Sequence, residues 1–105
     1  MSSLGGVGKV QPANKDIMTM VLKVKTHVET KLGQQYHCFR AISFRQQLVN
    51  GINYFVKVKV GEGEYVHLRI YQDFKKTITR LDAVQAHKSE DSTIEFFDID
   101  PSLSH

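Results

Sequence analysis

The chain has 105 residues, which is enough for one domain with a single hydrophobic core and too few for two. Hydrophobic residues make up 41% and charged residues 24%, a composition that is typical of a soluble globular protein and argues against disorder. The formal net charge of +3 is modest, and no apolar run approaches the ~20 residues that a membrane-spanning helix needs.

Residues 1–12 open the chain with Gly5, Gly6 and Gly8 and end in Pro12. Such a segment is expected to be flexible unless a neighbour holds it. A second interpretation is a backbone that lies very close to a partner, where a side chain would clash. The glycines do not follow a strand and are not followed by Lys-Ser/Thr, so they do not form a phosphate-binding loop.

Residues 14–32 carry a clear helical pattern. Asn14 can cap the N-terminus, Asp16 lies favourably in the first turn, and Gly33 is a natural terminator. Spacings of three and four residues place one apolar stripe on one face, made of Ile17, Val21, Val24, Val28 and Leu32. The opposite face carries charged residues and is expected to face solvent.

The rest of the chain is predicted to form strands. Alternation of apolar and polar residues, or strand-forming composition, marks the ranges 39–48, 52–60, 65–71, 81–88 and 93–97. Asn50-Gly51 is a strong signal for a tight hairpin, and residues 61–64 are predicted to form a turn. One amphipathic helix followed by antiparallel strands indicates an α+β domain, with the helix packed across one face of the sheet.

Cysteine usage and the N-terminus predict an intracellular protein. Cys38 is the single cysteine, and the sequence contains no Asn-x-Ser/Thr glycosylation site. The opening stretch lacks the basic region and apolar region of a signal peptide. We therefore expect a cytoplasmic location.

The sequence gives no positive sign of an enzyme. His37 is adjacent to Cys38 and would point to the opposite face of a strand, so a catalytic thiol is not expected. The histidines lack metal-ligand spacing, and neither a metal nor a cofactor is predicted. His67 is expected to lie at the surface.

The lysines and arginines lie between Lys9 and Lys88, whereas five of the 11 acidic residues lie in the last sixteen positions. A solvated charged surface explains this distribution, although a basic body could also attract nucleic acid. An alternative function is therefore a β-sheet module that binds single-stranded nucleic acid. Its basic, aromatic face would consist of Lys57, Lys59, Tyr65, Arg69 and Tyr71. A structural protein without an enzyme target is a third possibility.

Several ordered motifs resemble the cystatin superfamily, and more closely the stefins, its intracellular type without disulfides. The pattern Gln-x-Val-x-Gly occurs at residues 47–51, followed at once by INYFVKV. Gly5-Gly6 near the N-terminus, QPAN before the helix, KVK within it and YVHLRIYQ in a later strand extend the resemblance over residues 4–97.

The resemblance implies a five-stranded antiparallel sheet wrapped around one long helix. It also implies reversible, tight inhibition of papain-like cysteine proteases, including lysosomal cathepsins, by a wedge of three segments. The trunk would direct Leu4 at the non-primed substrate pockets, and hairpin loops would supply the rest of the wedge. The implied protease-binding residues are Leu4, Gly5, Gly6 and Val7; Gln47, Leu48, Val49, Asn50 and Gly51; and Asp73, Phe74 and Lys75.

The sequence departs from the stefin pattern in the second loop, where Phe74-Lys75 replaces the usual Leu-Pro. Phe74 can supply the apolar contact, but Lys75 adds charge and lacks the fixed φ of proline. We expect a single domain at 1–97, with the trunk at 1–12, and a disordered acidic tail at 98–105. The expected state is a monomer, with a domain-swapped dimer as the alternative; swapping through the first hairpin would straighten residues 48–51.

Overall fold

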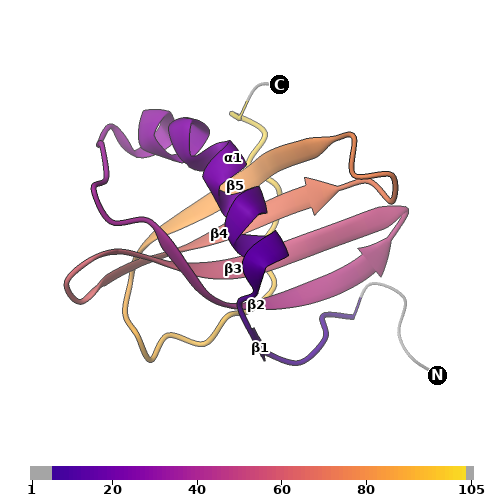
Figure 1. Ribbon diagram of the computed structural model, residues 1–105, viewed down its shortest axis with the longest axis horizontal. Coiled ribbons are helices and arrows are strands. Elements are labelled where there is room, and N and C mark those ends of the chain that lie inside the picture. The colour runs from indigo at the N-terminus through magenta and orange to yellow at the C-terminus, as the bar shows by residue number, and fades with distance from the viewer. Residues whose placement is uncertain (1–5, 104–105) are drawn as a thin grey trace.

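The computed structural model of the protein describes residues 6–103. Its elements are β1 (Gln11–Pro12), α1 (Lys15–Leu32), β2 (Arg40–Val49), β3 (Gly51–Gly61), β4 (Glu64–Gln72) and β5 (Thr79–Lys88). The strands form one antiparallel sheet in the order β1-β2-β3-β4-β5, and α1 crosses one face of it (Figure 1). The predicted α+β class, with one helix on a five-stranded sheet, is confirmed.

Local signals account for the two ends of α1. The Asn14 side chain accepts a hydrogen bond of 2.9 Å from the backbone N–H of Ile17, which satisfies one of the unpaired donors of the first turn. At the other end Gly33 has a φ of 69°, and its N–H donates to the carbonyl of Glu29. This left-handed cap stops the helix where the sequence predicts it to stop.

The core lies between α1 and the inner face of the sheet. The predicted stripe of α1 is buried except at Leu32, which is half-buried. It packs on side chains of alternate strand positions, including Phe44, Val56, Val58, Val66, Leu68, Ile70 and Leu81. Burial of this apolar surface is the main stabilising contribution to the fold.

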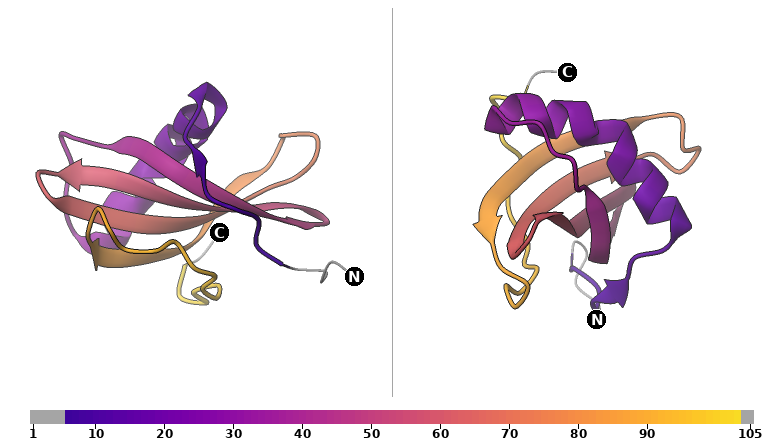
Figure 2. Two further views of the ribbon diagram at one scale, coloured as in Figure 1. Left: turned by 90° about the horizontal axis from the view of Figure 1, so that it is seen from below. Right: turned by 60° about the vertical axis from the view of Figure 1, so that its left-hand side comes forward.

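The C-terminal segment, residues 89–103, runs over the face of the sheet turned away from α1, here called the outer face, and ends next to Lys31 of α1 (Figure 2). The rings of Phe96 and Phe97 lie 5.6 and 5.5 Å from that of Phe55, which is fully buried in β3. These three rings therefore form a second, smaller apolar cluster between the outer face and the C-terminal segment.

The strand predicted at 93–97 is wrong. In this segment the carbonyls of Ile94 and Phe97 accept hydrogen bonds from the side chains of Arg45 and Arg69 rather than from a neighbouring strand. The fifth strand is instead β1, which precedes the helix and pairs with β2 at Phe44. The apolar side chains of residues 93–97 pack on the outer face. An apolar composition is equally typical of a strand and of a segment that covers a sheet, so it does not distinguish the two.

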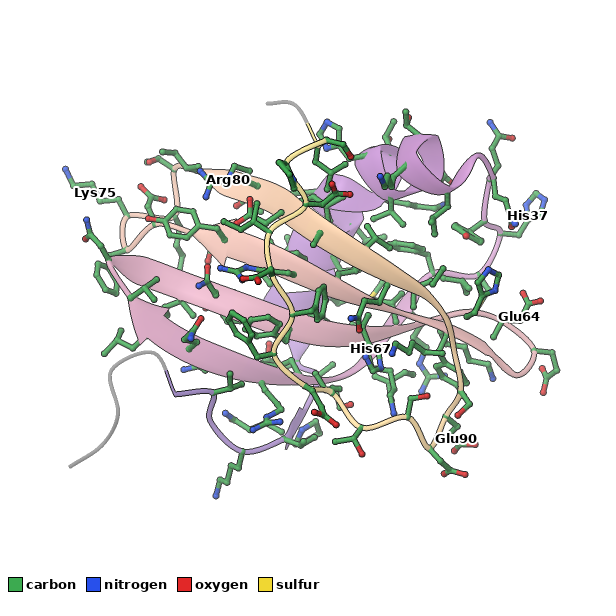
Figure 3. The ribbon with its side chains drawn as sticks, turned by 180° about the vertical axis from the view of Figure 1, so that it is seen from behind. His37, Glu64, His67, Lys75, Arg80 and Glu90 are labelled. Carbon is green, nitrogen blue, oxygen red and sulfur yellow. The ribbon has the colours of Figure 1, made fainter. Side chains whose placement is uncertain are left out.

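The basic residues of the outer face are also covered. Lys57 is buried and its ammonium group donates to the carbonyl of Glu90, while Tyr65 and Arg69 are buried as well. His67 is fully buried, so its predicted surface position is wrong. Figure 3, which views the molecule from the side opposite to Figure 1, shows the C-terminal segment running over the strands.

The acidic end of the chain, predicted to be disordered, makes defined contacts as far as residue 103. The Asp100 N–H donates to the carbonyl of Asp82, at 2.8 Å. The Asp100 carboxylate forms a 2.9 Å ion pair with Lys31 of α1 and accepts hydrogen bonds from Ser102. These partners lower the pKa of Asp100 to about 2.

Candidate functional site

Three segments meet at one end of the sheet, which we call the loop edge: residues 6–8, 48–51 and 73–78. The β2–β3 hairpin and the β4–β5 loop lie at the same end because Ile52 pairs with Gln72. The N-terminal segment reaches this end by running antiparallel to β2, with the Gly8 N–H donating to the Gln46 carbonyl at 2.8 Å. Figure 1 shows all three segments at the right of the molecule.

The first hairpin turns at a single residue. Val49 pairs with Gly51, so Asn50 alone occupies the apex. A two-residue Asn-Gly turn of type I′ would require positive φ at both residues. Gly51 has a φ of 115°, whereas Asn50 is not among the residues with positive φ. The predicted hairpin is confirmed, but its turn is centred on Asn50 and not on the Asn-Gly pair.

Leu48 and Val49 give the hairpin an apolar end. They are consecutive strand residues and therefore point to opposite faces. Their side chains are 66% and 38% exposed, respectively. Leu48 lies on the same face as the buried Phe44, but beyond the part of the sheet that α1 covers. Its exposure is thus a consequence of the hairpin extending past the core.

Gln47 lies inside the hairpin rather than on its rim. It is buried and pairs across the strands with Asn53, whose side-chain amide donates to the Gln47 side-chain oxygen at 2.9 Å. This contact between two buried amides fixes the strands just below the exposed Leu48 and Val49. In the free protein Gln47 supports the hairpin from beneath.

The second loop is organised by Asp73. Its carboxylate accepts hydrogen bonds from the backbone N–H of Ile78, at 2.8 Å, and from the Thr77 hydroxyl, at 2.7 Å. These donors lower the pKa of Asp73. Asp73 therefore holds the loop together. Phe74 is 61% exposed, and Lys75 projects from the loop into solvent (Figure 3).

The predicted trunk is only partly within the described residues. Leu4 and Gly5 lie outside them. Gly6 is exposed and Val7 is half-buried next to β2. A Cβ atom added to Gly8 would lie 3.3 Å from the Gln46 carbonyl oxygen, so glycine allows the trunk to approach the hairpin closely.

Tyr71, at the end of β4, connects the first hairpin to β5 beside the second loop, a role that the sequence did not predict. Its hydroxyl donates to the Asn50 carbonyl at 2.5 Å, and its ring lies directly below Gly51. The guanidinium of Arg80, from the far side of the second loop, stacks 4.7 Å from the Tyr71 ring centroid. Alternation along β4 identifies the face of Tyr71, but it does not predict these neighbours.

The loop edge presents the exposed apolar side chains of Leu48, Val49 and Phe74. In the described part of the chain, no group of three or more His, Cys, Asp or Glu side chains is arranged to hold a metal ion. Cys38 lies away from the loop edge and contacts the Lys59 carbonyl. Between residues 6 and 103 there is also no helix with the length and apolar character to span a membrane.

Comparison with known proteins identifies the family. The cystatin domain model matches residues 5–92. Cystatin-A3 of Dictyostelium discoideum is 47% identical over 85 residues, covering 81% of this chain and 88% of the relative. Cystatin-A of Mus musculus is 31% identical over 94 residues, covering 89% of this chain and 97% of the relative. Leukocyte cysteine proteinase inhibitor 1 of Sus scrofa is 36% identical over 95 residues, covering 89% of this chain and 92% of the relative. The chain therefore belongs to the cystatin family, and its relatives include stefin-type members.

Proposed function

We propose that this protein is a reversible, tight-binding inhibitor of papain-like cysteine proteases of the cathepsin type. The observation that carries the proposal is the loop edge, where exposed Leu48, Val49 and Phe74 lie beside the N-terminal segment in a member of the cystatin family. Leukocyte cysteine proteinase inhibitor 1, a relative of similar length, is named as an inhibitor of cysteine proteinases.

The mechanism we infer is occlusion of the active-site cleft without covalent chemistry. Leu48 and Val49 would insert as the tip of a wedge, flanked by the trunk residues Leu4 to Val7 and by Phe74. Burying each exposed apolar side chain would contribute about 1–2 kcal/mol. The hairpin is already fixed by its strand ladder and by the Tyr71 contact, so little conformational entropy is lost on binding.

The Phe74-Lys75 pair would tune selectivity. Lys75 and the neighbouring Lys76 are exposed, so the second loop presents positive charge beside an aromatic ring. Proteases with acidic residues near this loop are expected to bind faster at low salt. We further propose that the inhibitor acts in the cytoplasm. We also propose that its active form is a monomer, because a domain swap that straightened residues 48–51 would remove the tip of the hairpin.

The nucleic-acid alternative finds no support, because its face is the outer face. Lys57 and Arg69 are buried and donate to the carbonyls of Glu90 and Phe97, and Tyr65 is buried as well. A strand of nucleic acid would have to displace the C-terminal segment to reach the two basic side chains.

Titration of active-site-counted papain and a cathepsin with the purified chain tests the proposed function. The wild-type chain should inhibit both, and Leu48→Gln should raise the inhibition constant at least tenfold. Leu22→Gln is the matched control, because Leu22 is 51% exposed on α1, away from the loop edge. A folded wild-type chain that inhibits neither enzyme, or equal losses in the two variants, would overturn the proposal.

A further inference from the structure

Arg45 joins the N-terminal segment, β2 and the C-terminal segment through three backbone carbonyls. Its Nε donates to the Gly8 carbonyl at 2.6 Å, and one terminal nitrogen donates to the Val7 carbonyl at 3.3 Å. The other terminal nitrogen donates to the Ile94 carbonyl at 2.6 Å. None of the ion pairs formed within residues 6–103 involves Arg45, so its charge is directed at peptide oxygens.

These contacts are a large part of what holds the trunk. Residues 7 and 8 lie on the N-terminal side of β1. They make three hydrogen bonds with the rest of the described chain, and Arg45 donates two of them. The third joins the Gly8 N–H to the Gln46 carbonyl. Of the three hydrogen bonds that residues 7 and 8 make within the described chain, only the one between the Gly8 N–H and the Gln46 carbonyl does not depend on Arg45.

The C-terminal segment holds the Arg45 guanidinium on the side away from the trunk. Ile94 is buried, and the residues that follow it pack their rings on Phe55, the residue that pairs with Arg45 across β2 and β3. A planar guanidinium with five fixed donors can reach carbonyls on both sides at once. A lysine ammonium is a single compact group and cannot bridge the two segments in the same way.

We propose that Arg45 is a positioning residue that holds the trunk in line with the hairpin tip, with the C-terminal segment as its anchor. The proposal rests on the proposed inhibitory function, because the trunk is one of the three segments of the wedge. A trunk that is already aligned loses less conformational entropy when the enzyme binds. Arg45 would therefore strengthen inhibition without touching the protease.

Hydrogen exchange without any protease tests the structural part. The Gly8 amide should lose at least tenfold of its protection in Arg45→Gln, and a smaller loss is expected in Arg45→Lys. Arg40→Gln is the matched control, since it removes an exposed arginine from the other end of the same strand. Unchanged Gly8 protection in a folded Arg45→Gln chain would overturn the proposal whether or not the protein inhibits proteases.

A double-mutant cycle tests the functional part in full-length chains. Arg45→Gln should raise the inhibition constant for papain at least fivefold in the native chain. In a chain that carries Leu4→Gln and Val7→Gln, whose trunk offers the enzyme no apolar side chain, Arg45→Gln should change the inhibition constant less than twofold. Equal factors in both chains would mean that Arg45 does not act through the trunk. Loss of inhibition in the wild type itself would reject the proposed function, and the exchange result would still decide the role of Arg45.

Discussion

The Tyr71 hydroxyl donates a hydrogen bond to the Asn50 carbonyl at 2.5 Å, so one side chain joins the end of β4 to the apex of the first hairpin. The same ring lies under the backbone of Gly51, where a Cβ atom would come within 2.5 to 2.7 Å of its hydroxyl and ring atoms. Arg80 covers the ring from the side of the second loop. Tyr71 therefore joins the apex of the first hairpin to the ends of β4 and β5, the two strands that the second loop connects.

Substitution of Gly51 by alanine is expected to disturb this connection. A φ of 115° is unfavourable for an L-residue, and the new methyl group would push Tyr71 away from Asn50. Unfolding free energy should fall by about 1–3 kcal/mol, and the inhibition constant should rise at least tenfold. Denaturant titration and protease inhibition would measure the two effects.

Gly63→Ala is the control for that prediction. Gly63 also has a positive φ, 69°, but it lies in the β3–β4 turn at the opposite end of the sheet and has open space where a Cβ would stand. It should lose stability through backbone strain while inhibition stays unchanged. If Gly51→Ala inhibits as well as Gly63→Ala, the first hairpin is not part of the wedge.

Periodicity predicted α1 and the long strands because each buries one face against the other. The caps at Asn14 and Gly33 could also be predicted, since they depend on hydrogen bonds a few residues away. The fate of residues 93–97 could not be predicted, because their apolar composition fits both a strand and a covering segment. Likewise Arg45 and Tyr71 act through neighbours about twenty to fifty residues distant, and no local spacing encodes such contacts.

Deletion of residues 1–6 is expected to weaken inhibition at least tenfold, or about 1.4 kcal/mol of binding free energy. The fold should survive, because the core begins at α1 and the deleted residues precede the Gly8–Gln46 hydrogen bond. Inhibition constants for several papain-like proteases, with circular dichroism as the control for folding, would measure the effect. Unchanged constants would remove the trunk from the mechanism.

Asp73→Ala is expected to loosen the second loop without unfolding the domain. The substitution leaves the Ile78 N–H and the Thr77 hydroxyl without their carboxylate partner, so exchange of the Ile78 amide should accelerate. The lowered pKa of Asp73 means that its contribution is present above the ordinary carboxyl range and is lost as the pH falls through the folded-state pKa. Exchange that is unaltered between wild type and Asp73→Ala at neutral pH would contradict this role.

His67 is expected to make the stability of the whole domain depend on pH. Burial, followed by the positive charges of Lys88 and Lys57, lowers its pKa from 6.5 to about 4. Both ring nitrogens are buried, and neither has a hydrogen-bond partner among the described residues. The unfolded chain therefore takes up a proton below pH 6.5 that the folded protein resists until about pH 4.

The sign of the effect follows from this order of protonation. The contribution of His67 is fully present above pH 6.5 and is lost as the pH falls to about 4, with a total of about 3 kcal/mol. Unfolding free energies measured across this range should fall less steeply in His67→Leu than in the wild type. His27→Leu, at an exposed position of α1, should keep the wild-type slope. Identical slopes in wild type and His67→Leu would show that a different group controls the response to acid.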